Sequence, residues 1–293
     1  MHVASPHLWL EQLRQLSPHQ PAVLITVTGS QGSVPRQPGA RMLVTTDSLY
    51  DTIGGGHLEW KAIAQARLWL EDQQDVLDCT RHATLALGPS LGQCCGGVVR
   101  IMLERVDAWS DAARVERLAG YQQESLVLPH LYLFGAGHVG CAVVHALQNT
   151  PCRITWVDER DHLFPADLPA HIITEATDIP EAVIANAAPG SYFLVMTHHH
   201  GLDLHLCEHI LRSNHAAWFG LIGSLTKRAR FEHRLREKHI SQRQLDQMHC
   251  PIGLPGITGK EPGVIAIAVA AQLLQVWTEK SVQTASSAFA ETT

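Results

Sequence analysis

Residues 131–140 read Leu-Tyr-Leu-Phe-Gly-Ala-Gly-His-Val-Gly, and this stretch decides the fold of the second half of the chain. The apolar run 131–134 predicts a buried strand. The apolar spacing over 139–147 predicts a helix that begins directly after the glycine-rich turn. A strand, a glycine turn and a helix in immediate succession are typical of the opening of a nucleotide-binding α/β domain.

The turn carries three glycines, and an acid ends the next predicted strand, 153–157. Gly135 permits a tight turn, Gly137 lets the backbone approach a phosphate, and Gly140 lets the helix pack closely on the strand. The helix N-terminus adds unpaired N–H groups and partial positive charge. Asp158 would accept hydrogen bonds from hydroxyls or ring N–H groups of a ligand. The pattern favours a phosphate-containing ligand over a fold that has lost its ligand and keeps the glycines for packing.

The rest of the second half alternates short apolar runs with amphipathic segments. Such alternation predicts a Rossmann-like parallel-sheet domain over residues 129–278. Further strands are expected at 171–174, 192–196 and 218–222, and further helices at 180–187, 202–212, 225–238 and 261–277. Ligands bind open sheets of this kind at the carboxyl ends of the strands, so the loops that follow these strands are candidate site segments.

The loop after strand 192–196 carries three histidines. His198, His200 and Asp203 could coordinate a metal or hydrogen-bond a polar ligand. We favour the polar ligand, because three adjacent histidines cannot all point to one side of an extended chain.

The turn after strand 218–222 is a candidate second anion-binding turn. It holds Ser224, which is also a candidate helix N-cap, and Lys227. The alternative is that Ser224 only caps the helix and that the basic run 227–236 is a solvated helix face.

The first part of the chain reads as short strands joined by glycine-rich loops. The β-branched run 22–27 predicts a buried strand. Glycine-rich loops are expected at 29–36, 52–57 and 87–97. Three such loops in one modest domain favour a shared ligand site, because glycine lets the backbone pass close to a ligand. We therefore expect a smaller N-terminal α+β domain over residues 1–106.

Two segments complete the expected organisation of the 293 residues. Residues 107–128 are polar and helix-prone, and we expect them to link the two domains. Residues 279–293 are small, polar and aperiodic, which predicts a disordered tail.

Charge and hydropathy exclude several classes of function. Twenty-two Lys and Arg residues against 28 Asp and Glu residues give a net charge of −6. This argues against a general nucleic-acid or anionic-membrane surface, although a local basic patch can still hold one small anion. No uninterrupted apolar run reaches the ~20 residues needed to cross a bilayer, and the N-terminus lacks the pattern of a secretory signal. We therefore expect a soluble, cytoplasmic protein.

The seven cysteines contain no C-x-x-C pair, and their scatter fits a reducing compartment. Cys94 and Cys95 stand out, because the two thiols are adjacent and are followed by two glycines.

Many separate segments of the chain resemble the XdhC/CoxI family. In the first part they are 32–36 (Gly-Ser-Val-Pro-Arg), 39–42, 53–59 and 88–97 (Gly-Pro-Ser-Leu-Gly-Gln-Cys-Cys-Gly-Gly). In the second part they are 134–140, 157–158, 195–198, 221–224 with Lys227 and Arg228, and 250–262. So many matches in order make the resemblance specific. It departs at His199, since relatives tend to have serine between the two histidines.

The resemblance implies a maturation factor rather than a catalyst. Such a protein would bind the molybdenum cofactor in its molybdopterin form, support replacement of its terminal oxo ligand by sulfur, and deliver it to apo xanthine dehydrogenase, an enzyme of purine catabolism. The implied partners are xanthine dehydrogenase as acceptor and a cysteine desulfurase as sulfur donor. A homodimer is compatible with the several apolar helices.

The resemblance also gives the candidate residues a role. The glycine turn would hold the phosphate of the pterin, and Asp158 would meet its polar ring atoms. Cys94 or Cys95 would approach molybdenum or handle sulfur, because thiolates are soft ligands and nucleophiles. The alternative is that one of them is simply a small buried residue. The candidate cofactor-binding residues are Cys94, Cys95, Gly135, Gly137, His138, Gly140, Asp158, His198, Ser224 and Lys227.

Two other classes of function stay open at this point. The glycine turn also suits an NAD(P)-dependent oxidoreductase that acts on a small substrate. The absence of a Tyr-x-x-x-Lys pair weakens that interpretation. A protein adaptor that uses both domains as docking surfaces is the third.

Overall fold

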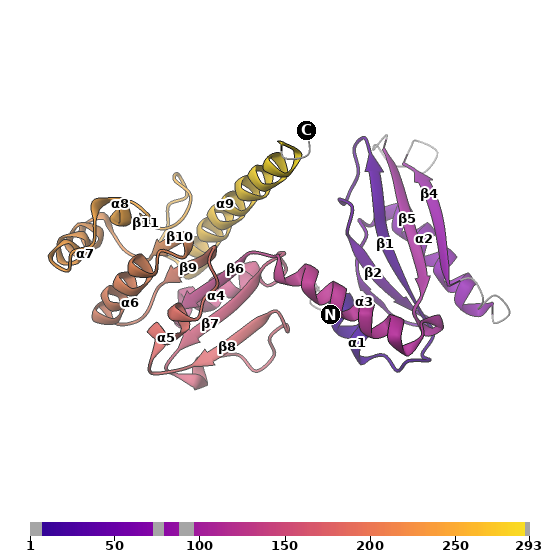
Figure 1. Ribbon diagram of the computed structural model, residues 1–293, viewed down its shortest axis with the longest axis horizontal. Coiled ribbons are helices and arrows are strands. Elements are labelled where there is room, and N and C mark those ends of the chain that lie inside the picture. Colours follow the sequence, from indigo (N-terminus) through magenta and orange to yellow (C-terminus); the bar gives the residue numbers. More distant parts are fainter. Residues whose placement is uncertain (1–7, 73–78, 88–96, 291–293) are drawn as a thin grey trace. The chain divides into compact units, whose positions relative to one another are not determined.

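The structure is a computed structural model that describes residues 8–72, 79–87 and 97–290 of the chain. The chain divides into two compact units, residues 1–127 and 128–293, and each unit has its own sheet (Figure 1).

The first unit is built on a five-stranded antiparallel sheet in the order β3-β2-β1-β5-β4. Its strands are β1 (Ala22–Gln31), β2 (Arg41–Thr45), β3 (Leu49–Asp51), β4 (Thr80–Ala86) and β5 (Val98–Arg105). Its helices are α1 (Leu8–Gln15), α2 (Gly56–Glu71) and α3 (Asp111–Leu126), with a short 3-10 turn at Val106–Ala108. The expected α+β class of this part is confirmed.

The central strand β1 is buried on both faces, which explains its run of consecutive apolar residues. Successive side chains of a strand point to opposite faces of the sheet. Val23 and Ile25 therefore pack with Trp69 of α2 on one face. Leu24 packs with Leu13 of α1 on the other face.

The segment expected to link the domains is a packed helix of the first unit. Ser110 caps α3 by accepting a hydrogen bond from the amide of Ala113. The guanidinium of the buried Arg114 donates to the carbonyl oxygens of Leu13 and Leu16, at 2.7 Å each. The apolar stripe of α3 is weak, but this one arginine ties the helix to the end of α1, where the carbonyls lack partners within the helix.

The second unit is built on a six-stranded parallel sheet in the order β11-β10-β9-β6-β7-β8. Its strands are β6 (His130–Phe134), β7 (Arg153–Asp158), β8 (Ile172–Ala176), β9 (Ser191–Val195), β10 (Ala216–Leu221) and β11 (Met248–His249). Its main helices are α4 (His138–Leu147), α5 (Pro180–Ala185), α6 (His200–Ser213), α7 (Leu225–Glu237) and α9 (Pro262–Ala290); α8 (Gln242–Leu245) is a single turn. The expected Rossmann-like parallel sheet is confirmed.

Helices cover both faces of this sheet, as Figure 1 shows. Leu131 and Leu133 of β6 face a core that includes α4 and α9. Tyr132 and Phe134 face a second core that includes α5, α6 and α7. Burial on both faces is why the strands read as continuous apolar runs rather than as alternating patterns.

The strand order fixes where a ligand can enter. After β8 the chain crosses back and adds β9 on the other side of β6, so β6 has β7 on one flank and β9 on the other. Ligands of open α/β sheets bind at the carboxyl end of such a switch point. The glycine turn directly follows β6 and therefore lies at this edge.

Helix α9 is longer than the sequence predicts, and it extends through most of the expected disordered tail to Ala290. Residues 278–290 contain neither glycine nor proline, so nothing in the chain ends the helix at Trp277. Its stretch Pro262–Lys280 is long and apolar enough to cross a membrane by length and composition. However, Val269 and Leu273 are buried in the core beside α4, as in the core helix of a globular domain.

Arg114→Ala should loosen the first unit. The change leaves two carbonyl oxygens of the α1 segment without their donor, which should cost about 1–3 kcal/mol. Arg14→Ala is the matched control, because Arg14 also joins α1 to α3, through Gln122 at 3.0 Å, but in an exposed contact. Hydrogen exchange of the α1 amides in the full chain measures both. Equal protection in the two variants would contradict the role given to Arg114.

Candidate functional site

The glycine turn after β6 has the geometry of a phosphate-binding turn. Gly135 has a φ of 120°, and its amide donates to the carbonyl of Val157 at 2.8 Å. A Cβ at Gly135 would lie 2.3 Å from the carbonyl oxygen of Met196, and one at Gly140 would lie 2.1 Å from the carbonyl oxygen of Gly135. Both positions therefore require glycine, one for the turn and one for the close approach of helix α4.

Gly137 differs from these two glycines because space is open around it. A Cβ there would meet no atom within 4 Å, and the residue has an ordinary φ of −75°. Gly137 is the N-cap of α4, and no side chain caps this end. The amides of the first helical turn are thus available to an anion that comes close to the backbone. His138, the first residue of the helix, is exposed.

The carboxylate of Asp158 is already occupied by donors of its own chain. It accepts the amide of Ala136 at 2.7 Å and the amide of Arg160 at 3.0 Å. The guanidinium of Arg160 adds two more hydrogen bonds, at 2.8 and 2.9 Å, one to each carboxylate oxygen. Asp158 is only 7% exposed. It therefore fixes the glycine turn to the end of β7 and does not present free acceptors to a ribose or a pterin.

These contacts set the charge state of Asp158. Burial alone would raise its pKa, but the hydrogen bonds from Arg160 and Ala136 stabilise the charged form and lower the pKa to about 2. Arg160 was not among the predicted site residues. The sequence did carry a signal for this contact, because an arginine two residues after an acid at the end of a strand can fold back and bind that acid.

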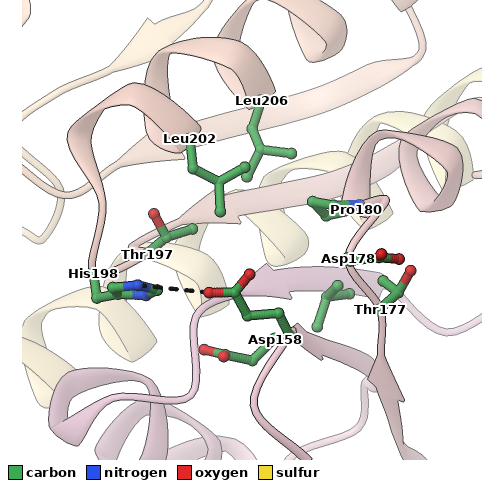
Figure 2. Close-up of a pocket in the computed structure, with 10 residues that line it drawn as sticks. Asp158, Thr177, Asp178, Pro180, Thr197, His198, Leu202 and Leu206 are labelled. Atoms are coloured by element: carbon green, nitrogen blue, oxygen red, sulfur yellow. Dashed lines mark ion pairs between the residues drawn. The ribbon is translucent and has the colours of Figure 1, made fainter.

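A small acidic cavity of about 60 Å³ is lined by Asp158, the residue that holds the glycine turn. Figure 2 shows Asp158, Thr177, Asp178 and His198 around it. Asp158 ends β7, and the others lie in the segments that follow β8 and β9. His198 lies 3.7 Å from Glu159, the ion pair that the dashed line marks. His198 thus faces a carboxylate of the protein itself, which does not suit the binding of an anionic ligand.

A buried ion pair holds the segment after β9. Asp203, 1% exposed, accepts the amide and the hydroxyl of Thr197, at 3.0 and 2.7 Å. Its other oxygen accepts the ammonium of Lys227 at 2.6 Å. Lys227 also donates to the carbonyl of Ile222 at 2.8 Å, so two of its three donors serve the fold. The main role of Lys227 is therefore structural, because its ammonium joins α7 to α6.

Ser224 caps helix α7 by accepting the amide of Lys227 at 3.3 Å. An open cavity of about 480 Å³ lies here, between the segment that begins α6 and the first turns of α7. Thr197 lines both this cavity and the acidic one.

The three histidines after β9 do not form one site. His199 caps α6 by accepting the amide of Leu202 at 3.2 Å, His198 faces Glu159, and His200 lines the cavity beside α7. The chain is not extended here, because α6 begins at His200. Across residues 8–72, 79–87 and 97–280, no group of three His, Cys, Asp or Glu side chains is placed to hold a metal ion.

In the first unit the loop at 29–36 contacts the loop at 52–57 and also Gly97. A Cβ at Gly54 would lie 2.6 Å from the side chain of Pro35, and one at Gly97 would lie 2.3 Å from the carbonyl of Ser33. Glu59 holds the loop at 52–56 by accepting the amides of Ile53 and Gly55, at 3.1 and 3.0 Å. Cys94 and Cys95 lie outside the described residues.

Comparison with known proteins places the chain in a family. A family model described as the XdhC Rossmann domain matches residues 131–273, and one described as the XdhC and CoxI family matches residues 15–80. The chain belongs to the XdhC and CoxI family. Among curated proteins, this XdhC/CoxI member is 29% identical over 260 residues to YqeB, an uncharacterized protein of Escherichia coli K12. The match covers 87% of the chain but only 43% of YqeB.

The XdhC/CoxI chain also shares its fold with a solved structure. A crystal structure described as a xanthine dehydrogenase from Bacillus halodurans aligns over 94% of this chain and 96% of that one. The TM-score is 0.73 at 20% sequence identity. At this identity the likeness concerns the fold.

Asp158→Asn should destabilise the second unit at neutral pH. Because the pKa of Asp158 is about 2 in the folded chain against an ordinary 3.8, the stabilisation is complete above about pH 4 and is lost as the pH falls through 2. The expected loss at pH 7 is about 2 kcal/mol. Urea unfolding of the full chain between pH 2 and 7 measures it. Asp178→Asn, in the same cavity but exposed, is the control and should change little. A difference between wild type and Asp158→Asn that does not shrink toward pH 2 would refute this.

Proposed function

We propose that this chain is a maturation factor for xanthine dehydrogenase that binds the molybdenum cofactor as cargo. In this proposal it holds the pterin while a terminal oxo ligand of molybdenum is replaced by sulfur and then delivers the cofactor to the enzyme. Membership of the XdhC/CoxI family supports a role in maturation. The glycine turn is the part of the chain suited to the phosphate of the pterin.

The observation that carries the proposal is the contrast between Gly137 and Asp158. The open backbone at Gly137 and the uncapped start of α4 suit a phosphate. A dinucleotide dehydrogenase also uses the acid after the second strand to accept ribose hydroxyls. Here the carboxylate oxygens of that acid already accept hydrogen bonds from Ala136 and Arg160. Phosphate recognition without ribose recognition fits a phosphorylated pterin better than NAD(P).

The remaining parts of the proposal concern sulfur and partners. Cys94 or Cys95 would contact molybdenum or carry sulfur, as expected of soft thiolates. A cysteine desulfurase would supply the sulfur, and xanthine dehydrogenase would receive the cofactor. A homodimer and a cytoplasmic location stay predictions.

Gly137→Asp should weaken retention of the molybdenum cofactor. The new side chain fits, because space around Gly137 is open and its φ is ordinary, but its carboxylate would occupy and repel the phosphate position. We expect roughly a tenfold loss of affinity, equivalent to about 1.4 kcal/mol. The measurement is co-elution of pterin fluorescence and molybdenum with the protein in gel filtration.

Gly120→Asp is the matched control for this variant. It adds the same charge at another open glycine, in α3, and should retain the cofactor like the wild type. Free elution of pterin and molybdenum from the wild-type chain would refute the proposal. Tight NADH binding with turnover of a small carbonyl compound would instead support the oxidoreductase.

Cys94→Ala combined with Cys95→Ala should lower activation of apo xanthine dehydrogenase while leaving pterin retention largely intact, because the phosphate contacts lie elsewhere. Cys79→Ala, a change at a partly exposed cysteine, is the control. Activation assays in the presence of a cysteine desulfurase measure the effect. Full activation by the double variant would rule out the cysteine assignment.

A further inference from the structure

The cavity between α6 and α7 has a strongly basic wall. Its cationic lining residues are Lys227, Arg230 and Arg234, all from α7, and His200 lies across from them at the start of α6. Asp203 is the one carboxylate among its lining residues, and it is buried under Lys227. In a chain with a net charge of −6, this is a local concentration of positive charge.

The basic residues of helix α7 lie on two different faces of the helix. Lys227, Arg230 and Arg234 follow one another at intervals of three and four, so they share one face. Arg228 and Arg236 lie on another face, and each forms an ion pair with Glu232 between them, at 2.8 and 3.1 Å. On that face one carboxylate lies between two guanidinium groups and compensates part of their charge within the helix.

The pairing of the basic residues on the cavity face is different. Lys227 is paired with Asp203. Within the part of the chain that the structure describes, Arg230 and Arg234 have no carboxylate within 4 Å, and both are exposed. Like charges four residues apart on a helix disfavour it slightly. An anion between the two guanidinium groups would reverse that cost.

The geometry points to a ligand of defined chemistry. We infer that this cavity is a second anion site, separate from the glycine turn, which binds the pyrophosphate group of a small molecule through Arg230 and Arg234. A guanidinium presents a planar fork of donors that matches phosphoryl oxygens, and two forks suit two linked phosphoryl groups. A volume of about 480 Å³ lies in the range of small-molecule sites. The acidic chain argues against a long polyanion.

The placement within the sheet supports a site distinct from the first. The glycine turn follows β6, in the first half of the doubly wound sheet, whereas this cavity lies beyond β9 and β10, in the second half. Thr197, held by Asp203, stands between the basic cavity and the acidic one. The inference does not depend on the proposed maturation role.

The test is calorimetric titration of the full chain with inorganic pyrophosphate at low ionic strength without divalent cations. Arg230→Gln combined with Arg234→Gln should weaken binding at least tenfold. Arg230→Lys with Arg234→Lys keeps the charge without the fork and should give an intermediate loss. Arg236→Gln with Arg243→Gln removes the same charge from exposed positions outside the cavity lining and should bind like the wild type. Near-ultraviolet circular dichroism verifies the fold of each variant.

The outcomes separate this site from the proposed function. Gly137→Asp should bind pyrophosphate normally, even though it should lose the molybdenum cofactor. No pyrophosphate binding by the wild type at millimolar concentration would overturn the inference, as would equal weakening by the control pair. Loss of single-stranded DNA binding without loss of pyrophosphate binding in the glutamine pair would mark a nucleic-acid surface instead and would also overturn it.

Discussion

The hydrogen bonds to Asp158 are the interaction on which the edge of the parallel sheet depends. A turn of three glycines has little conformational preference of its own, because glycine reaches many backbone conformations at similar cost. The carboxylate of Asp158 removes this freedom by binding the amide of Ala136 inside the turn. Arg160 compensates the charge, so a buried acid is stable there without a ligand. The start of α4 is thereby presented in one conformation.

The same principle recurs in the first unit with a different residue. Glu59, in the first turn of α2, accepts amides from the glycine loop that precedes the helix. Both units thus use a carboxylate on a regular element to order a glycine-rich loop beside it. In both cases the acid serves the loop, and the open backbone of the loop is left for other contacts. A sequence shows the acid and the glycines but does not show whether the acid is free.

Much of the fold followed from the sequence, because continuous apolar runs and glycine turns are strong local signals. The strand after residue 130, the helix that follows it and the acid at 158 were all predicted, and the parallel sheet is confirmed. Short elements such as β3, β11 and α8 were missed, since two to four residues carry no periodicity. The role of Lys227 was beyond prediction, because its partner Asp203 is brought to it only by tertiary packing. The pairing of Asp158 with Arg160 is local and could have been predicted. The apolar stripe of α3 is too weak to predict that this helix packs on the first unit, where the buried Arg114 holds it.

The ion pair between Asp203 and Lys227 has a kinetic consequence for whatever enters the cavity beside α7. The pair joins Thr197, the start of α6 and the start of α7 before any molecule arrives. Binding of a molecule here therefore costs little free energy for ordering these segments. Because the site is preorganised in this way, the proposed contacts with the arginines set the residence time of the bound molecule. Small changes in the charge of that molecule then alter its dissociation rate.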